Sequence, residues 1–299
     1  MFKRILLWFW MNIAIMIVLT AVFAVLEHFF GIKLDLYWTN YVSILIYAAI
    51  IWFTWSFISL AISKWMAKKA YNITILTKAD YYNLDSKQKI VWDTISDLSE
   101  KNRIKMPEVW IYTSNEPNAF ATWMTKNSSL VAVSTWLLSS MDNWAIEWVI
   151  GHEMAHILNW DMVTMTLLQW VLNTFVVFFA RIISNIIAEK LDEWLSWIAY
   201  FFVNMLLQIL FGLLASLIAM KFSRYREFRA DEGSARFLGK EKMIAWLEAL
   251  KRMQSIASSD DSKLAAMKIS TKWKSGLMAM FSSHPDLDDR INALKGLNI

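Results

Sequence analysis

Four stretches of the chain contain no charged residue, and each is long enough to cross a lipid bilayer as a helix. These apolar runs are residues 5–26, 36–63, 162–180 and 194–220 of a 299-residue chain. About 20 apolar residues in a helix span the ~30 Å hydrocarbon layer. Because 57% of the residues are hydrophobic and only 19% are charged, lipid must solvate part of the folded surface. The runs predict a mainly α-helical protein with four transmembrane or membrane-associated helices.

Basic residues gather at the outer ends of the two pairs of runs. They are Lys3, Arg4, Lys64, Lys68 and Lys69 around the first pair, and Lys221, Arg224, Arg226 and Arg229 after the fourth run. Only Lys33 lies between the first two runs. The positive-inside rule predicts two hairpins in a bacterial inner (plasma) membrane, a multi-pass protein with both termini and the soluble parts cytoplasmic. A cleaved signal peptide at the first run is disfavoured, because its apolar core is too long and no small-residue cleavage site follows.

The third and fourth runs have an alternative to full spans. Gln169 and Asn173 lie one helical turn apart and prefer a protein neighbour to lipid. These runs are therefore also compatible with packing partly within a catalytic domain. The same two residues suggest a small transporter, but no charged residue interrupts a run to mark an ion path.

The composition restricts the chemistry. The chain has no cysteine, so any metal must be held by His, Asp or Glu. The net charge is +4 and the isoelectric point is about 9.0, which is compatible with nucleic-acid binding. However, the basic residues lie beside apolar runs and form no single stripe, so we expect a lipid bilayer and no nucleic acid as partner.

The segment 66–160 reads as a soluble region. Helical apolar spacing predicts a helix over residues 86–104, stopped by Met106-Pro107. Three β-rich runs follow, at residues 108–112, 118–122 and 129–134. A second helix, capped by Asp142, is predicted from about Asn143 through His156.

This second helix contains the motif His-Glu-x-x-His at residues 152–156. The i, i+4 spacing places the imidazoles of His152 and His156 on one helical face, where both can bind one tetrahedral zinc ion. Glu153 is then the predicted general base, taking a proton from water and returning it to the leaving amine. The alternative is a chance motif on a packed helix, but the chain has only four histidines and two are here.

An open zinc site needs a third protein ligand. We predict Glu227, which follows the fourth run, with Asp231 on the same helical face to accept the Nδ1 proton of a zinc-bound histidine. Glu232, Glu189 and Asp161 are rival carboxylates. A solvated charged helix is the default interpretation of this segment taken alone.

Two further assignments concern the substrate. Residues 118–122, with Asn118, Ala119 and Phe120, are a candidate edge strand that pairs with an extended substrate; an ordinary core strand is an equal alternative. His284 is a candidate oxyanion contact near the cleft, although a His-Pro turn more often only starts a helix.

These residues resemble the HtpX-type membrane metalloproteases, relatives of the CAAX prenyl endoproteases, over nearly the whole chain. Besides the metal motif, the resemblance lies in NAFA (118–121), LVAVST (130–135), NWDMVTMT (159–166), SRYREFRAD (223–231) and SHPDLDDRI (283–291). It implies an α+β gluzincin-like zinc-protease domain with His152, His156 and Glu227 as ligands. It also implies a role in membrane quality control.

The sequence therefore predicts a membrane zinc metalloendopeptidase with one Zn²⁺ per chain, acting at the cytoplasmic face, and the resemblance implies damaged or misassembled membrane proteins as its substrates. The expected divisions are a hairpin (1–65), a catalytic region (66–160), a second helix pair (161–220) and a C-terminal catalytic region (221–299). Homo-oligomers or quality-control partners are compatible with this prediction. A catalytically inactive membrane scaffold of the same fold is the alternative.

The balance of glycine and tryptophan is unusual. The chain has 7 Gly and 18 Trp, whereas about 7% Gly is ordinary. Several Trp stand where a turn or a close helix contact favours glycine, and the resembling family has Gly at Trp123, Trp136, Trp160 and Trp170. We hypothesise that many of these positions are glycine in the native protein, encoded by a reassigned UGA codon. Otherwise, Trp side chains crowding the metal helix would impair activity.

Overall fold

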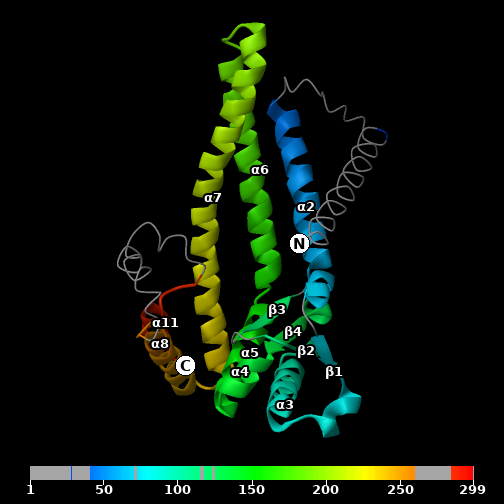
Figure 1. Ribbon diagram of the computed structural model, residues 1–299, viewed down its shortest axis with the longest axis vertical. Helices are drawn as coiled ribbons and strands as arrows, with labels where there is room; N and C mark the ends of the chain where they lie inside the picture. The colour runs from blue at the N-terminus through cyan, green and yellow to red at the C-terminus, as the bar shows by residue number, and fades with distance from the viewer. Residues whose placement is uncertain are drawn as a thin grey trace. The chain divides into compact units, whose positions relative to one another are not determined.

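The computed structural model describes residue 28 and residues 41–70, 73–114, 118–122, 125–259 and 284–298. Its helices and strands are shown in Figure 1. In chain order they are α2 (Tyr41–Ala70), β1 (Ile73–Leu76), the 3-10 helix η1 (Lys78–Asn83), α3 (Ser86–Lys101), β2 (Glu108–Tyr112), β3 (Ala119–Thr122), η2 (Lys126–Ser128), β4 (Leu130–Ser134), α4 (Thr135–Ser140), α5 (Asn143–Leu158), α6 (Asp161–Ala188), α7 (Glu193–Leu238), α8 (Lys240–Ser259) and α11 (Leu287–Lys295). The chain divides into two compact units, Met1–Ser59 with Thr166–Ala219 and Leu60–Met165 with Met220–Ile299.

Among the described residues, three helices are long and apolar enough to cross a membrane. The candidate spans are Val42–Lys69 within α2, Asp161–Ala188 and Glu193–Leu238. They contain the third and fourth apolar runs and residues 42–63 of the second, which the sequence predicted as helices; residues 36–40 lie outside the described residues. The predicted first span, residues 5–26, lies outside the described residues. Helix α7 has 46 residues and continues well beyond its apolar run, so the same helix carries Glu227 and Asp231.

The second unit contains a small mixed sheet of four strands in the order β1-β2-β4-β3. Strands β2 and β4 are parallel, and the two outer pairs are antiparallel. The predictions of β2, β3 and β4 are confirmed, whereas β1 was not predicted from the sequence. Within the described part of the chain, β3 is an edge strand with β4 as its one neighbour.

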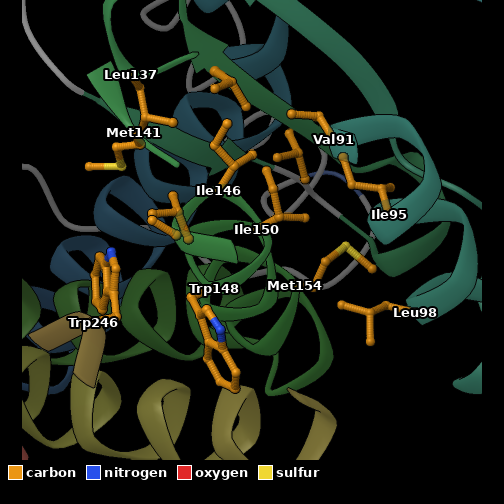
Figure 2. Close-up of a cluster of buried hydrophobic side chains, with 14 of the residues drawn as sticks. Val91, Ile95, Leu98, Leu137, Met141, Ile146, Trp148, Ile150, Met154 and Trp246 are labelled. Carbon is orange, nitrogen blue, oxygen red and sulfur yellow. The ribbon is translucent and has the colours of Figure 1, made fainter. Parts of the chain in front are cut away.

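Alternate residues of the sheet face two different apolar clusters, as expected for a side-chain period of two. Val109, Ile111, Val131 and Val133 pack with residues of α3 and α5 in the larger cluster. Figure 2 shows this cluster, with Val91, Ile95 and Leu98 of α3 beside Ile146, Ile150 and Met154 of α5. On the other face, Trp110, Tyr112, Leu130 and Ala132 form a smaller cluster with Ala67 near the end of α2. The sheet is therefore a scaffold against which α5 is held.

Helix α3 is shorter than predicted, whereas α5 begins where the sequence predicted. Helix α3 ends at Lys101 and not at residue 104, because Arg103 adopts a left-handed backbone conformation with φ 54°, which terminates the helix before Pro107. Helix α5 begins after Asp142, as predicted, but the Asp142 side chain makes no capping hydrogen bond.

Trp160, which follows the C-cap residue Asn159 of α5, has φ 61°. A residue with a Cβ costs roughly 1–2 kcal/mol in this left-handed region, and glycine is the usual residue there. Trp148 is 1% exposed, and its indole Nε1 has no hydrogen-bond partner among the described residues. Trp110, by contrast, donates its indole hydrogen bond to Glu108 over 3.2 Å. The backbone at residue 160 thus supports the glycine hypothesis, which stays a prediction.

Candidate metal centre

Helices α5 and α7 approach each other closely through small residues. A Cβ added to Gly233 would lie 2.7 Å from the Cβ of Ala155, and one added to Gly151 would lie 2.8 Å from Oγ of Ser234. Real Cβ atoms do not approach other atoms this closely, so glycine permits the contact. Since Glu227 lies less than two turns before Gly233 on α7, this packing brings its carboxylate to the histidines of α5.

The structure brings three predicted ligands together. Nε2 of His152 lies 3.1 Å from Nε2 of His156. The Glu227 carboxylate lies 3.6 Å from the first of these atoms and 3.5 Å from the second. A tetrahedral zinc ion with bonds of about 2.0–2.1 Å separates its ligand atoms by about 3.3 Å. The donor set His152, His156 and Glu227 therefore fits a zinc ion, and we call it the metal centre.

The other ring nitrogen of each histidine faces a carboxylate. Nδ1 of His156 lies 2.6 Å from Oδ2 of Asp161. Nδ1 of His152 lies 3.0 Å from Oδ1 of Asp231, an ion-pair distance, although the ring N–H is not aligned with that oxygen as in a hydrogen bond. Both carboxylates leave Nε2 as the nitrogen that faces the metal centre.

Asp161 therefore faces a histidine ligand and is not itself the third ligand of the metal centre. It was a rival third ligand, but its carboxylate lies on the Nδ1 side of His156. It is the first residue of α6, only five residues after His156, and Arg226 donates to its backbone oxygen over 3.1 Å. The short spacing between His156 and Asp161 is the sequence signal that points to this contact.

The remaining rivals lie elsewhere. Glu232 forms an i, i+4 ion pair with Arg236 at 2.8 Å. Glu189 belongs to the other compact unit.

The C-terminal segment 284–298 contributes two residues. Nδ1 of His284 lies 2.9 Å from Oε2 of Glu227, and its side chain is 68% exposed. Arg290 of α11 donates two hydrogen bonds to Asp231. In the sequence, Arg290 was singled out only as a member of the motif SHPDLDDRI (283–291), and no role was predicted for it.

Glu153 lies between the metal centre and the edge strand β3. Burial raises the pKa of its carboxyl group, whereas His156, His152 and a hydrogen bond from the backbone of Ala121 lower it, and the net shift is upward. A raised pKa makes a carboxylate a stronger base. The Ala121 contact places the side chain of Glu153 beside the strand predicted to hold substrate.

The histidines are strongly basic when no metal is bound. Burial lowers the pKa of His152, but the carboxylates of Asp231 and Glu227 outweigh this effect and raise it to about 10. Burial also lowers the pKa of His156, and Asp161 and Glu227 turn the net shift upward. The negative surroundings thus favour a cation at the metal centre, either protons or a metal ion.

A His-Glu-x-x-His helix, a glutamate from a later helix and three candidate membrane spans define the class of membrane metalloproteases. The sequence profile of Peptidase family M48 matches residues 85–298, and the chain belongs to this family. Full-length matches to proteins named Protease HtpX confirm the sequence resemblance to the HtpX-type proteases.

Individual relatives agree over the full length. Protease HtpX of Alkalilimnicola ehrlichii is 46% identical over 298 residues, 98% of this chain and 97% of that protein. Protease HtpX of Idiomarina loihiensis is 44% identical over 295 residues, 98% of this chain and 99% of that protein. The crystal structure of S. mikatae Ste24p superposes with a TM-score of 0.66 at 16% identity, covering 98% of this chain and 64% of that chain. At this identity the likeness concerns the fold alone.

Proposed function

We propose that the protein is a zinc metalloendopeptidase that hydrolyses peptide bonds of membrane proteins at the cytoplasmic face, with one zinc ion per chain. His152, His156 and Glu227 are its ligands, and Glu153 is its general base. Damaged or misassembled membrane proteins are the proposed substrates, in keeping with the resemblance of the chain to the HtpX-type proteases.

One observation carries the proposal. The three donor groups have spacings of 3.1, 3.5 and 3.6 Å, close to the ~3.3 Å edge of a tetrahedral zinc site. Three protein ligands leave one position open, which is the pattern of a catalytic site and not of a structural one.

The chain's own groups have distinct roles in this proposal. When bound, zinc supplies an electrophile that polarises the scissile carbonyl and acidifies water. Glu153 accepts the proton of the attacking water and returns it to the leaving amine. His284 orients Glu227 through the 2.9 Å contact and is the proposed contact of the developing oxyanion.

We also propose that the substrate binds as an additional strand beside β3. Asn118, directly before β3, directs its main-chain groups toward Ser134 of β4: its carbonyl accepts from the N–H of Ser134 over 2.9 Å, and its N–H donates to Oγ of Ser134 over 3.1 Å. Since alternate residues of a strand direct their main-chain groups to opposite edges, Ala119 and Ala121 present theirs to the outer edge of β3, where the N–H of Ala121 donates to Glu153. Pairing through main-chain atoms tolerates many sequences, which suits a quality-control protease.

The proposed orientation rests on the positive charges that flank the spans. Lys64, Lys68 and Lys69 follow the apolar run of α2, and Lys221 follows that of α7, so the unit that carries the metal centre is cytoplasmic. The proposed catalytic domain is gluzincin-like and combines residues 66–160 with 221–299. Segments 1–65 and 161–220 provide the membrane helices.

The variant Glu153→Gln tests the function. In proteoliposomes, we expect the purified variant to keep one zinc per chain but to lose peptide hydrolysis by at least about 100-fold, the lower end of general-base contributions. Glu147→Gln, on the same helix, is the matched control and should retain full activity. Full activity of Glu153→Gln would refute the assigned base. Folded wild-type protein without metal and without hydrolysis would favour the scaffold alternative.

A further inference from the structure

A buried ion pair links α11 to the metal centre. Nε of Arg290 donates to Oδ2 of Asp231 over 2.6 Å, and Nη2 donates to Oδ1 over 2.5 Å. Arg290 is 7% exposed and Asp231 is 1% exposed. This two-point contact fixes both the position and the plane of the carboxylate.

The same carboxylate faces the metal ligand His152. Oδ1 of Asp231, which accepts from Arg290, also lies 3.0 Å from Nδ1 of His152. Asp231 therefore stands between the guanidinium group and the imidazole ring. A rotation of this carboxylate would move the negative charge that faces Nδ1 of His152 and so weaken the interaction that orients the ring and its Nε2.

The aspartate carboxylates that face the two histidines are held in different ways. Asp161 follows His156 by five residues and is fixed at the start of α6. Asp231 depends on Arg290, which arrives from a segment 59 residues later in the chain. Among the described residues, α11 therefore contacts the carboxylate behind His152 and not the one behind His156.

We propose that Arg290 is a positioning residue of the metal centre: it holds Asp231 in the plane that directs Nε2 of His152 to the zinc ion. This inference rests on the proposed zinc site. Arginine suits the task because its rigid planar fork binds both carboxylate oxygens, whereas lysine offers a single point charge on a flexible stem.

The variant Arg290→Lys separates this geometric role from charge. In full-length protein, we expect zinc to be lost to excess chelator about 10- to 100-fold faster than from wild type, the range typical of partners behind a metal-bound histidine. The visible spectrum of the cobalt-substituted variant should also change, since it reports the ligand geometry. Thermal unfolding of the metal-free variant should match that of the metal-free wild type.

The matched control is Lys251→Met. Lys251 forms an ion pair with Asp288 that ties α8 to α11, and its side chain is 52% exposed. Its loss weakens the docking of α11 without touching Asp231, so zinc retention and the cobalt spectrum should remain those of wild type. If Arg290→Lys does not fold, Asp231→Asn/Arg290→Gln leaves no unpaired buried charge, and it should show the same accelerated loss of zinc.

Two results would overturn the inference. One is wild-type zinc retention and an unchanged cobalt spectrum in the arginine variants. The other is an equal defect in Lys251→Met, which would assign the effect to docking of α11 as a whole. If wild-type protein itself binds no zinc, the proposed metal site fails first and the inference with it.

Discussion

Gly233 of α7 lies so close to Ala155 of α5 that a Cβ at residue 233 would be 2.7 Å from the Cβ of Ala155. The variant Gly233→Ala must push the helices apart, which moves Glu227 away from His152 and His156. A displacement of about 1 Å at an active site can cost about 100-fold in rate, so we expect a loss of that order together with weaker zinc binding. Hydrolysis rates and zinc stoichiometry measure the two effects.

Gly212→Ala is the control for this prediction. Gly212 lies on the same helix, and a Cβ there would meet nothing within 4 Å. The variant should therefore behave as wild type. Unchanged zinc affinity and activity in Gly233→Ala would show that the close approach of α5 and α7 does not determine the geometry of the metal centre.

Asp161→Asn should weaken the metal centre from its other side. The amide keeps the size of the side chain but removes the negative charge that faces Nδ1 of His156 at 2.6 Å. Loss of such a partner typically costs about 10- to 100-fold in metal affinity or activity. Competition with a chelator of known affinity measures the change. Asp97→Asn, in the exposed pair with Lys101, is the control, and an equal effect there would contradict the prediction.

The elements that the sequence predicted correctly are those with a local signal. The apolar runs in α2, α6 and α7 and the strands β2, β3 and β4 each depend on residue types within one short segment. Strand β1 (Ile73–Leu76) was not predicted, although its residues Ile-Thr-Ile-Leu favour a strand, and its pairing with β2 depends on tertiary packing.

The residues of the metal centre also differ in whether a local sequence signal predicts them. His152 and His156 are fixed by helical spacing, and Glu227 could be inferred from chemistry and chain direction. The pairing of Arg290 with Asp231 could not be inferred, since it depends on how α11 packs beside α7. Asp161 shows a different limit, because its residue type suits both a ligand and a partner of His156, and only the geometry distinguishes the two.

Zinc uptake should depend on pH. With its pKa raised to about 10 by Asp231 and Glu227 against the effect of burial, His152 carries a proton at neutral pH that zinc must displace. The apparent zinc affinity should therefore rise as the pH rises from neutral toward about 10. Calorimetric titrations in buffers of different ionisation enthalpy would measure the released proton, and a pH-independent affinity would contradict the prediction.

The stability of the metal-free protein should depend on pH with the opposite sign. A histidine whose pKa rises on folding stabilises the folded state fully below its unfolded pKa of 6.5, and this contribution disappears as the pH rises through about 10. Thermal unfolding of the metal-free protein across this range measures the effect. Rising stability over the same interval would contradict the assigned shift.

The identity of residue 160 gives the last prediction. Trp160 has φ 61°, where a Cβ costs roughly 1–2 kcal/mol, whereas glycine adds about 0.5–1 kcal/mol of backbone entropy to be lost on folding. In protein that carries tryptophan at this position, Trp160→Gly should thus raise the free energy of unfolding by about 0.5–1 kcal/mol. Trp110→Gly, at a fully buried strand position, should lower it by about 3–5 kcal/mol or more.

Mass spectrometry of the peptide that contains residue 160, from protein isolated from its natural source, decides the native residue directly. We expect the mass of glycine there, because a left-handed residue after α5 fits glycine and strains tryptophan. The gene should then carry UGA at this position, whereas a UGG codon and a tryptophan mass would refute the reassignment. In that case the strain at residue 160 would be a genuine property of the turn between the metal-binding helix and Asp161.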